Sequence, residues 1–312
     1  MARSLTQFTR ALKSVRIQGA MAAARATLQA VAGYARALPR PRTAHDWAVL
    51  DARAQALAAV RPTEPLARNV ARWFVRELAS FAGAARSARE WPELTRRLEC
   101  ALLEYLEEID GSVVKTGERL VHSKQTIFTH CHSSVAEHVL VAAHRAGKRF
   151  KVYHTETRPL FQGHTTDRRL RQAKIPTTMV ADSAAAFLIS NHSGDNVRVS
   201  WVLLGADSIA RDGAVLNKIG SFGIALAAHD SKVPVYVAAP LLKVDWQGLS
   251  TFELRSAGEL WPRAPKGTKV LNFAFDRVPP AYITGLITEF GILKPSQVLR
   301  VVKQHYPWII GK

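Results

Sequence analysis

The sequence predicts an α/β protein with an N-terminal all-helical domain, residues 1–115, followed by a Rossmann-like domain built on a mostly parallel sheet, residues 116–312. Two observations support this fold class. Apolar side chains recur about every 3.6 positions over residues 1–110, which is the period of an amphipathic helix. After Gly111, short apolar runs alternate with helical stretches, and this alternation is typical of βαβ units.

The helical part is rich in Ala, Leu, Arg and Glu, and prolines interrupt it twice. One pair stands at Pro39 and Pro41, and the other stands at Pro62 and Pro65. Because proline lacks the amide hydrogen that a helix interior needs, we expect a loop at each of these places.

Five short apolar runs after Gly111 have the length of buried strands. The predicted strands are residues 126–130, 150–156, 177–181, 199–204 and 233–239. The predicted helices among them are residues 134–144, 163–174, 184–189 and 219–229. Residues 270–275 form a further candidate strand, and the prolines at 279 and 280 are expected to open a last helix over residues 281–290.

Composition limits the class of protein. No apolar run reaches the roughly 18 residues of a membrane span, so no membrane segment is expected. With only two cysteines, Cys100 and Cys131, the chain has no disulfide framework, and a reducing compartment such as the cytoplasm is expected. The histidines and cysteines lack the spacing of metal ligands, which predicts no metal site.

The chain is strongly basic, with a net charge of +18 from 43 Lys and Arg against 25 Asp and Glu. Such a charge suits nucleic acid, a membrane surface or a polyanionic small substrate. The acid-free start of the chain resembles an organellar presequence, but residues 15–20 continue into an Ala-rich helical pattern that belongs to the fold. Because no base-stacking motif accompanies the basic residues, specific nucleic-acid binding is not expected.

Cys131 is the first candidate for chemistry. It follows the predicted strand 126–130, and Ser134 and Glu137 have the spacing of a capping box, so a helix is expected to begin at Ser134. Open α/β sheets bind ligands at the edge where strands end and helices begin. A helix amino end also lowers the pKa of a thiol, although a lone cysteine can equally be a small apolar core residue.

Other polar segments follow the predicted strands, and parallel strands bring their carboxyl ends to one edge of the sheet. The segments are Thr155–Gly163, Gly205–Ser208 and Gly213–Gly220. Their polar groups fit a phosphorylated, hydroxyl-rich substrate. The converging set comprises the thiol of Cys131, the carboxylate of Asp207, the amides of Gln162 and Asn217, and the cations Arg158, Lys218 and Lys243.

These segments resemble a family of sugar-1-phosphate isomerases that includes methylthioribose-1-phosphate isomerase and ribose-1,5-bisphosphate isomerase. The family also contains non-catalytic regulatory subunits of the translation-initiation exchange factor. The resemblance covers residues 15–289 and is carried by the motifs THCHSS, TETRPLFQG, VADSAAAF, GADSIARDG, LNKIGSF, VPVYVAAP and FAFDRVPPAYITGLITEFG. Ser133, Ser134 and the all-helical N-terminus look closest to the ribose-1,5-bisphosphate isomerases.

The resemblance implies an aldose–ketose isomerase that converts ribose 1,5-bisphosphate to ribulose 1,5-bisphosphate without a cofactor, as a homo-oligomer (a dimer or a trimer of dimers). It implies that Asp207 is the acid that opens the sugar ring and that Cys131 is the base at C2, and it leaves open whether the hydrogen moves between C2 and C1 as a proton or as a hydride. It places on the substrate Gln18, Gly19, Ala20, Arg61, Ser133, Ser134, Gln162, Asn217, Lys218 and Lys243.

The chain departs from the family pattern in two places. The family has Arg-Gly-Ala where this chain has Gln18, Gly19 and Ala20, so one phosphate contact is weakened or comes from elsewhere, such as Arg16. Phe273 stands where a proline is usual.

Two alternatives stay open beside ribose 1,5-bisphosphate. One is a methylthioribose-1-phosphate isomerase, against which the basic charge argues, since one phosphate and a thioether need fewer cations. The other is a non-catalytic regulatory subunit that uses the charge to bind RNA, and the pair of Cys131 and Asp207 favours an enzyme over it. Whether a helix amino end or an apolar pocket dominates the pKa of Cys131 also stays open.

The remaining polar residues have structural interpretations. Glu156 and Arg158 form an ion pair under the site or contact the substrate. Asp182 and Asp276 are expected to cap or position neighbouring backbone. Cys100 is expected in a helix core, and the histidines are expected to serve packing or to lie at the surface.

Overall fold

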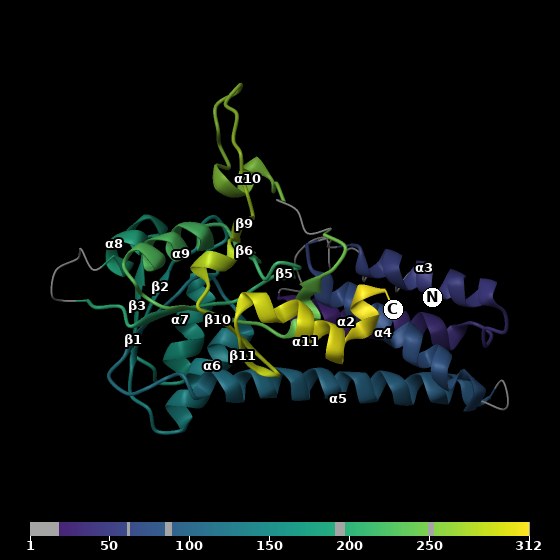
Figure 1. Cartoon of the computed structure of the whole chain (residues 1–312). Helices are drawn as coiled ribbons and strands as arrows, with labels where there is room; N and C mark the ends of the chain where they lie inside the picture. The colour runs from purple at the N-terminus through teal and green to yellow at the C-terminus, as the bar shows by residue number, and fades with distance from the viewer. Residues whose placement is uncertain (1–18, 61–62, 85–88, 191–196, 249–252, 312) are drawn as a thin grey trace.

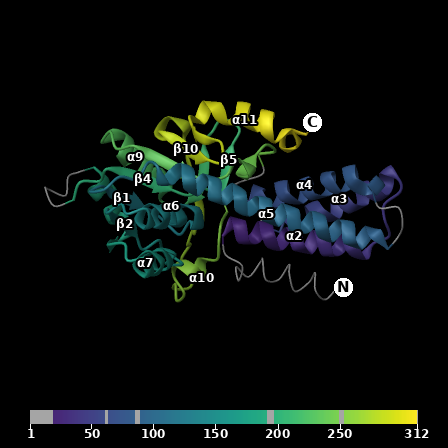
Figure 2. The same ribbon diagram turned by 90° about the horizontal axis from the view of Figure 1, so that it is seen from below.

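The computed structural model describes residues 19–60, 63–84, 89–190, 197–248 and 253–311. The molecule is elongated, with the N-terminal helices at one end and the sheet with its helices at the other (Figure 1, Figure 2). The long helix α5 (Glu90–Glu118) runs along both parts. The sequence prediction of a helical region followed by a mostly parallel sheet is therefore confirmed.

The helical part owes its form to apolar faces that pack against one another. Leu28, Phe74 and Leu106, from three different helices, are fully buried in its core. The loop expected at Pro39 is confirmed, and helix α4 begins at Pro65, where the missing amide hydrogen costs nothing because a first helical turn has no partner for it. The helices are α2 (Ala20–Ala37), α3 (Ala44–Ala58), α4 (Pro65–Phe81) and α5.

The main sheet has seven strands in the order β11-β10-β7-β4-β1-β2-β3, and only β10 and β11 pair antiparallel. The strands and helices predicted between residues 126 and 239 are confirmed. The strands are β1 (Thr126–Thr129), β2 (Lys151–Thr155), β3 (Thr177–Val180), β4 (Trp201–Leu204), β7 (Val235–Ala238), β10 (Gly285–Thr288) and β11 (Gly291–Leu293). The helices are α6 (Ser134–Arg145), α7 (Gly163–Gln172), α8 (Ala185–Ile189) and α9 (Ser221–Asp230).

The order of the strands reverses beside β1. The strands β2 and β3 lie on one side of β1, whereas β4 and β7 lie on the other. The loops that leave β1 and β4 therefore diverge, and open α/β sheets hold their ligands at such a switch point. Cys131 follows β1 and Asp207 follows β4, so the topology brings both candidate catalytic residues to this position.

A second sheet begins directly after the carboxyl end of β4, and its first two strands lie in segments that the sequence prediction treated as loop. Its strand order is β8-β5-β6-β9. Strands of two to four residues are too short to show a period of two, which is why the sequence did not reveal them. They are β5 (Ser208–Ala210), β6 (Val215–Lys218), β8 (Val244–Asp245) and β9 (Phe275–Val278).

The prediction for the C-terminal part is wrong in two places. The strand expected at residues 270–275 begins only at Phe275, where β9 pairs with β6. Residues 281–290, expected as a helix, form the end of a 3-10 turn (Pro280–Tyr282), then β10 and a turn that leads into β11. All four residues of β10 are buried, so its apolar run is a strand inside a covered sheet, which periodicity alone cannot distinguish from a helix.

A helix that was not predicted, α11 (Val298–His305), brings the end of the chain back to the helical part. Beyond it the indole of Trp308 stacks on that of Trp73 in α4, with ring centroids 5.4 Å apart. None of the helices in the described ranges is long and apolar enough to cross a lipid bilayer.

Candidate active site

A pocket with a volume of about 220 Å³ lies at the switch point of the main sheet. Its walls come from the start of α2, the loops after β1, β2 and β4, the strand β6 and the segments that lead into α4 and β9. It is lined by Gly19, Ala22, Glu64, Cys131, His132, Ser134, Leu160, Gln162, Asp207, Lys218, Arg255, Ala274 and Phe275.

The pocket unites both residues predicted as catalytic with four predicted on the substrate. A cysteine, a carboxylate, a lysine and an amide thereby share one cavity, although Cys131 and Lys218 lie far apart in the sequence. The residues that the sequence placed here and that line the pocket are Gly19, Cys131, Ser134, Gln162, Asp207 and Lys218.

Other predicted site residues are buried beside the pocket. Ala20 begins α2, directly after Gly19. Asn217 donates to Ser221 Oγ over 2.8 Å, and Lys243 Nζ donates to the carbonyl oxygen of Ala206 over 2.6 Å.

Ser133, not Ser134, caps helix α6, because its Oγ accepts the amide hydrogen of Ala136 at 3.4 Å. The helix itself begins at Ser134 as predicted. Gln18, Arg61 and Arg16 lie outside the described residues.

Sequence reasoning missed two charged residues of the pocket wall. Glu64 lies three positions after Arg61, the predicted contact, and this nearness in the sequence was the signal for it. Arg255 lies in a stretch without a clear period. Its guanidinium pairs with Glu259 through two contacts of 2.8 and 2.7 Å and with Glu253 at 3.3 Å.

Cys131 occupies the left-handed backbone region, with φ of 67°. Two other residues of the surrounding loops, Thr157 (φ 63°) and Phe161 (φ 55°), share this conformation. A non-glycine residue in this region costs of order 1–3 kcal/mol, and such residues gather at functional sites where neighbouring contacts hold them. Three of them around one pocket mark it as a built site.

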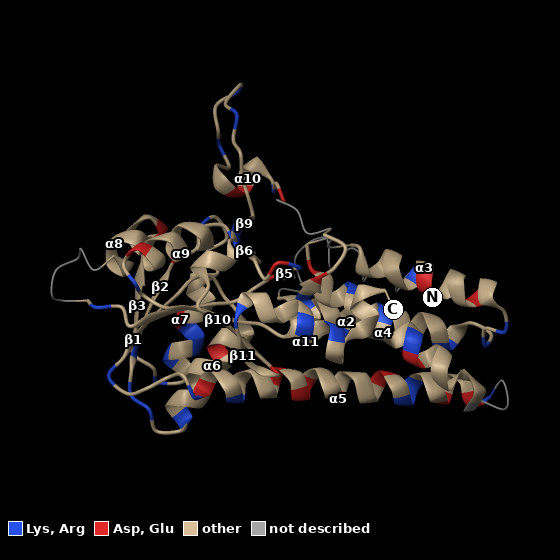
Figure 3. Ribbon diagram, viewed as in Figure 1, with Lys and Arg blue, Asp and Glu red and all other residues tan. Residues whose placement is uncertain are grey.

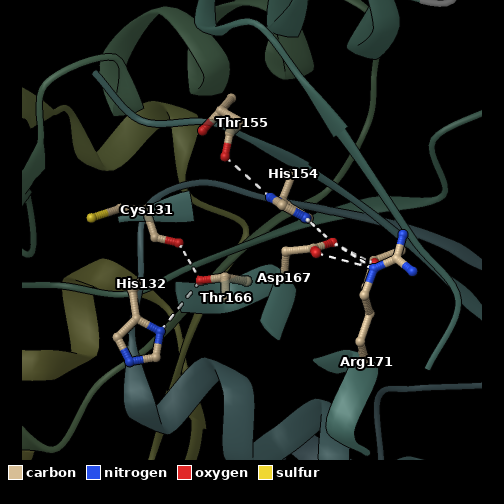
Figure 4. A network of polar contacts seen from close by, with 8 residues as sticks. Cys131, His132, His154, Thr155, Thr166, Asp167 and Arg171 are labelled. Carbon is tan, nitrogen blue, oxygen red and sulfur yellow. Dashed lines mark hydrogen bonds and ion pairs between the residues drawn. The ribbon is translucent and has the colours of Figure 1, made fainter. Parts of the chain in front are cut away.

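Hydrogen bonds hold the backbone of Cys131 on both sides. Its amide donates to Thr157 Oγ1 over 3.0 Å, and its carbonyl oxygen accepts from Thr166 Oγ1 at 2.8 Å. Figure 4 shows Thr166 between this carbonyl group and the ring of His132. The position of the sulfur is therefore set by the loop and by helix α7, which carries Thr166.

Two aspartates position the loops around the pocket, as predicted. Asp182 accepts the amide hydrogens of Thr157 and Arg158 at 2.8 and 2.7 Å. Asp276 accepts those of Gly220 and Phe222 at 2.7 and 3.1 Å.

Of the two alternatives left open for Arg158, the ion pair with Glu156 does not form: the guanidinium donates to the carbonyl oxygen of Leu260 at 3.0 Å and lies 5.0 Å from the ring centre of Phe161. The prediction for Cys100 is wrong, because this residue is exposed on α5 and does not lie in a helix core.

Burial raises the pKa of the Cys131 thiol to about 12. The positive charge of Lys218 opposes this rise, whereas the negative charge of Asp207 adds to it. Burial is therefore the largest influence on the pKa of this thiol. In the protein without substrate, the thiol is protonated at neutral pH.

Two lysines lie in this buried region, and one of them, Lys243, interacts with Asp207. Burial lowers the pKa of Lys243, while the charges of Asp207 and Glu64 raise it. Lys218 is also buried, at the end of β6. Buried cations of this kind carry a desolvation cost that an anionic ligand can offset, so the pocket is suited to a phosphate.

Among the described residues, no group of three or more His, Cys, Asp or Glu side chains is arranged to hold a metal ion. What the pocket offers is a proton donor and acceptor pair, Cys131 and Asp207, beside cations and amides. Such a set can move protons on a bound anion.

Residues 16–295 match the model of the Initiation factor 2 subunit family. The ribose 1,5-bisphosphate isomerase of Archaeoglobus fulgidus is 35% identical over 257 residues, which are 80% of this chain and 78% of that protein. The methylthioribose-1-phosphate isomerase of Pelotomaculum thermopropionicum is 34% identical over 311 residues, which are 93% of this chain and 83% of that protein. The crystal structure of the Pyrococcus horikoshii OT3 translation initiation factor eIF-2B has a TM-score of 0.78 at 25% identity, covering 95% of this chain and 98% of that one.

Proposed function

Because this chain belongs to the Initiation factor 2 subunit family and is an aldose–ketose isomerase of sugar phosphates, we propose that it converts ribose 1,5-bisphosphate to ribulose 1,5-bisphosphate. The observation that carries the proposal is the meeting of Cys131, Asp207 and Lys218 in one pocket at the switch point of the sheet.

The chemistry requires an acid and a base. A phosphate on C1 blocks ordinary ring opening, so a proton must be given to the ring oxygen as the bond from C1 to that oxygen breaks. A proton must then leave C2, a proton must be added at C1, and the C2 hydroxyl group must give up its proton, which the Asp207 carboxylate left by the first step can accept, to give the ketose. We assign the first step to Asp207 as the acid and the second to Cys131 as the base.

The raised pKa of Cys131 fits this assignment if the pair of Cys131 and Asp207 shares one proton. In the resting protein the proton sits on the thiol. In the reactive form it sits on the Asp207 carboxyl group, which leaves a strongly basic thiolate facing C2. Substrate phosphates beside Lys218 and Arg255, both in the pocket wall, hold the sugar between the two groups.

Two phosphates need two sets of donors. Lys218 and Arg255 line the pocket, and Lys243 lies buried next to it. This supply of cations favours a bisphosphate. The apolar side chains Leu160 and Phe275 in the same wall favour methylthioribose 1-phosphate as the second candidate, because they could pack against a thioether.

The test is an NMR assay of the purified protein with each sugar phosphate in turn. We expect conversion of ribose 1,5-bisphosphate with a kcat/KM at least about tenfold above that for methylthioribose 1-phosphate. The opposite preference would identify methylthioribose 1-phosphate as the substrate. A protein that converts neither sugar phosphate would favour a regulatory subunit.

Replacing Lys218 with alanine is expected to raise KM for the bisphosphate about tenfold to a hundredfold, because a charge-assisted phosphate contact contributes about 1.5–3 kcal/mol. The rise should be smaller for a monophosphate analogue that lacks the second phosphate. Lys303→Ala, at an exposed position of α11, is the matched control. Steady-state kinetics on both ligands measure the difference. An equal rise in KM for both would show that Lys218 does not contact the second phosphate.

We expect RNA binding to be weak and to fall steeply between low and physiological salt. Basic and acidic residues interleave along α5, and the basic residues are spread over both parts of the molecule (Figure 3). Such a surface attracts polyanions without selecting a sequence. Fluorescence anisotropy with a labelled RNA measures this, and sub-micromolar, sequence-selective binding at physiological salt would count against it.

We also propose that the protein works as a homo-oligomer, a dimer or a trimer of dimers, in the cytoplasm. The fold is shared with the chains of the tetrameric eIF2B-beta2-delta2 complex from C. thermophilum. Light scattering of the purified protein tests the proposed assembly.

A further inference from the structure

His130 is a buried side chain that the proposed reaction does not use. It lies directly before Cys131, at the end of β1, and only 2% of its surface is exposed. Both ring nitrogens are bonded: Nδ1 lies 2.6 Å from Thr155 Oγ1, and Nε2 lies 2.8 Å from the carbonyl oxygen of Ile219.

The contacts continue from Thr155 back to Cys131. Thr155 Oγ1 lies 2.9 Å from Thr157 Oγ1, and Thr157 Oγ1 accepts the amide hydrogen of Cys131 at 3.0 Å. Both threonine side chains are fully buried. One unbroken chain of hydrogen bonds therefore joins the Cys131 backbone to the carbonyl group of Ile219.

The chemistry of the two ends fixes the direction of this chain. The Cys131 amide can only donate, and the Ile219 carbonyl oxygen can only accept. With a neutral imidazole, Nε2 carries the hydrogen for Ile219, and Nδ1 must accept from Thr155. Thr157 then donates to Thr155, and its lone pair is left for Cys131.

Protonation of His130 would reverse the chain at Thr155. Nδ1 would then donate a hydrogen bond as well, so the Thr155 hydroxyl group would have to accept from Nδ1 and could no longer donate to it. The fixed orientation of the Thr157 hydroxyl group would be lost as a consequence. Burial lowers the pKa of His130, and the charge of Lys218 on β6 lowers it further, while the Ile219 contact and the charge of Asp182 from the 3-10 turn Asp182–Ala184 raise it. The neutral form is the one that the buried site favours.

The other end of the chain reaches the cation of the pocket. Ile219 follows Lys218 directly, and a Cβ atom placed on Gly220 would lie 3.2 Å from two ring atoms of His130. Gly220 also has a φ of 104°, so no other residue fits there without strain. The His130 ring thus packs against the turn that follows Lys218, and it is linked to the Cys131 amide through the hydroxyl groups of Thr155 and Thr157.

We propose that His130 is a positioning residue. As a neutral imidazole it holds Cys131 in its left-handed conformation and fixes the position of Cys131 relative to Lys218. The expected effect of His130 on turnover rests on the proposed function. The position of the Cys131 thiol can be probed without any substrate.

The experiment compares Thr155→Val with Thr155→Ser, in a Cys100→Ser background that leaves Cys131 as the single thiol. Valine removes the hydroxyl at nearly equal volume, whereas serine keeps it. We expect Thr155→Val to lower kcat by about tenfold to a hundredfold with little change in KM, because a misplaced base costs rate and not binding. Thr155→Ser should keep most of the wild-type rate.

The pH dependence of the rate at which iodoacetamide alkylates Cys131 is a second measurement, and a merely structural role of His130 would not change it. In the wild type, the rate should fall more steeply than the about tenfold per pH unit of a lone thiol once His130 gains its proton. In Thr155→Val the slope should return to that of a lone thiol. Identical pH profiles in the two proteins would overturn the proposal, whether or not the chain isomerises a sugar.

If Thr155→Val does not fold, His130→Asn and His130→Gln make the same comparison. An asparagine amide can replace the acceptor at Nδ1, and a glutamine amide can replace the donor at Nε2. We expect His130→Asn to retain the faster turnover and the more wild-type alkylation profile. A His130→Gln protein with a kcat equal to or above that of His130→Asn would contradict the role of the hydrogen bonds that lead from His130 to Cys131.

Discussion

Cys131→Ser is expected to lower kcat by at least about a hundredfold while the affinity for the substrate stays within about threefold. A serine hydroxyl at the same place is far too weak a base to take a proton from C2, yet it fills the same space in the pocket. The loop should also keep its conformation, since the contacts to Thr157 and Thr166 use the backbone of residue 131.

The measurements are kcat from an NMR time course and the dissociation constant from calorimetry. Cys100→Ser is the matched control, because Cys100 is exposed on α5. A Cys131→Ser protein with more than about a tenth of the wild-type rate would show that the thiol is not the base.

Asp207→Asn is expected to lower kcat by a similar factor, at least about a hundredfold, because the amide cannot give a proton to the ring oxygen. The same change has a second consequence. The Asp207 charge raises the pKa of Cys131, so its removal should lower that pKa and speed the alkylation of Cys131 at a fixed pH. One substitution thus makes the thiol more reactive and the enzyme slower.

This opposition separates a catalytic role from a general loss of structure. Asp212→Asn, which alters an exposed carboxylate paired with Arg277, is the control and should change neither quantity. Slower turnover together with slower alkylation in Asp207→Asn would indicate a distorted pocket and not a missing acid.

The sequence was sufficient for the βαβ part because each strand there is a short apolar run bounded by turns. It also placed Cys131 and Asp207 at the carboxyl ends of β1 and β4. It failed at residues 281–290, where a run of buried apolar residues fits a helix and a strand equally well, and only the neighbours β7 and β11 make it a strand.

The electrostatics of the site lay beyond the sequence for a different reason. A helix amino end and an apolar pocket act in opposite directions on the pKa of Cys131, and the balance depends on how deeply the folded chain covers the sulfur. Arg255 and Glu64 were missed because they enter the pocket from the segments before β9 and α4, which no local pattern connects with Cys131.

The most direct test of the central claim is the fate of hydrogen during the conversion of ribose 1,5-bisphosphate in D₂O, followed by proton NMR. If Cys131 takes a proton from C2 and the site returns one to C1, the thiol exchanges with solvent between the two events. We therefore predict ribulose 1,5-bisphosphate that carries deuterium at C1 in at least part of the product. Complete conversion without any deuterium would contradict the account, since hydrogen would then move directly between the carbons, and no conversion at all would contradict the isomerase itself.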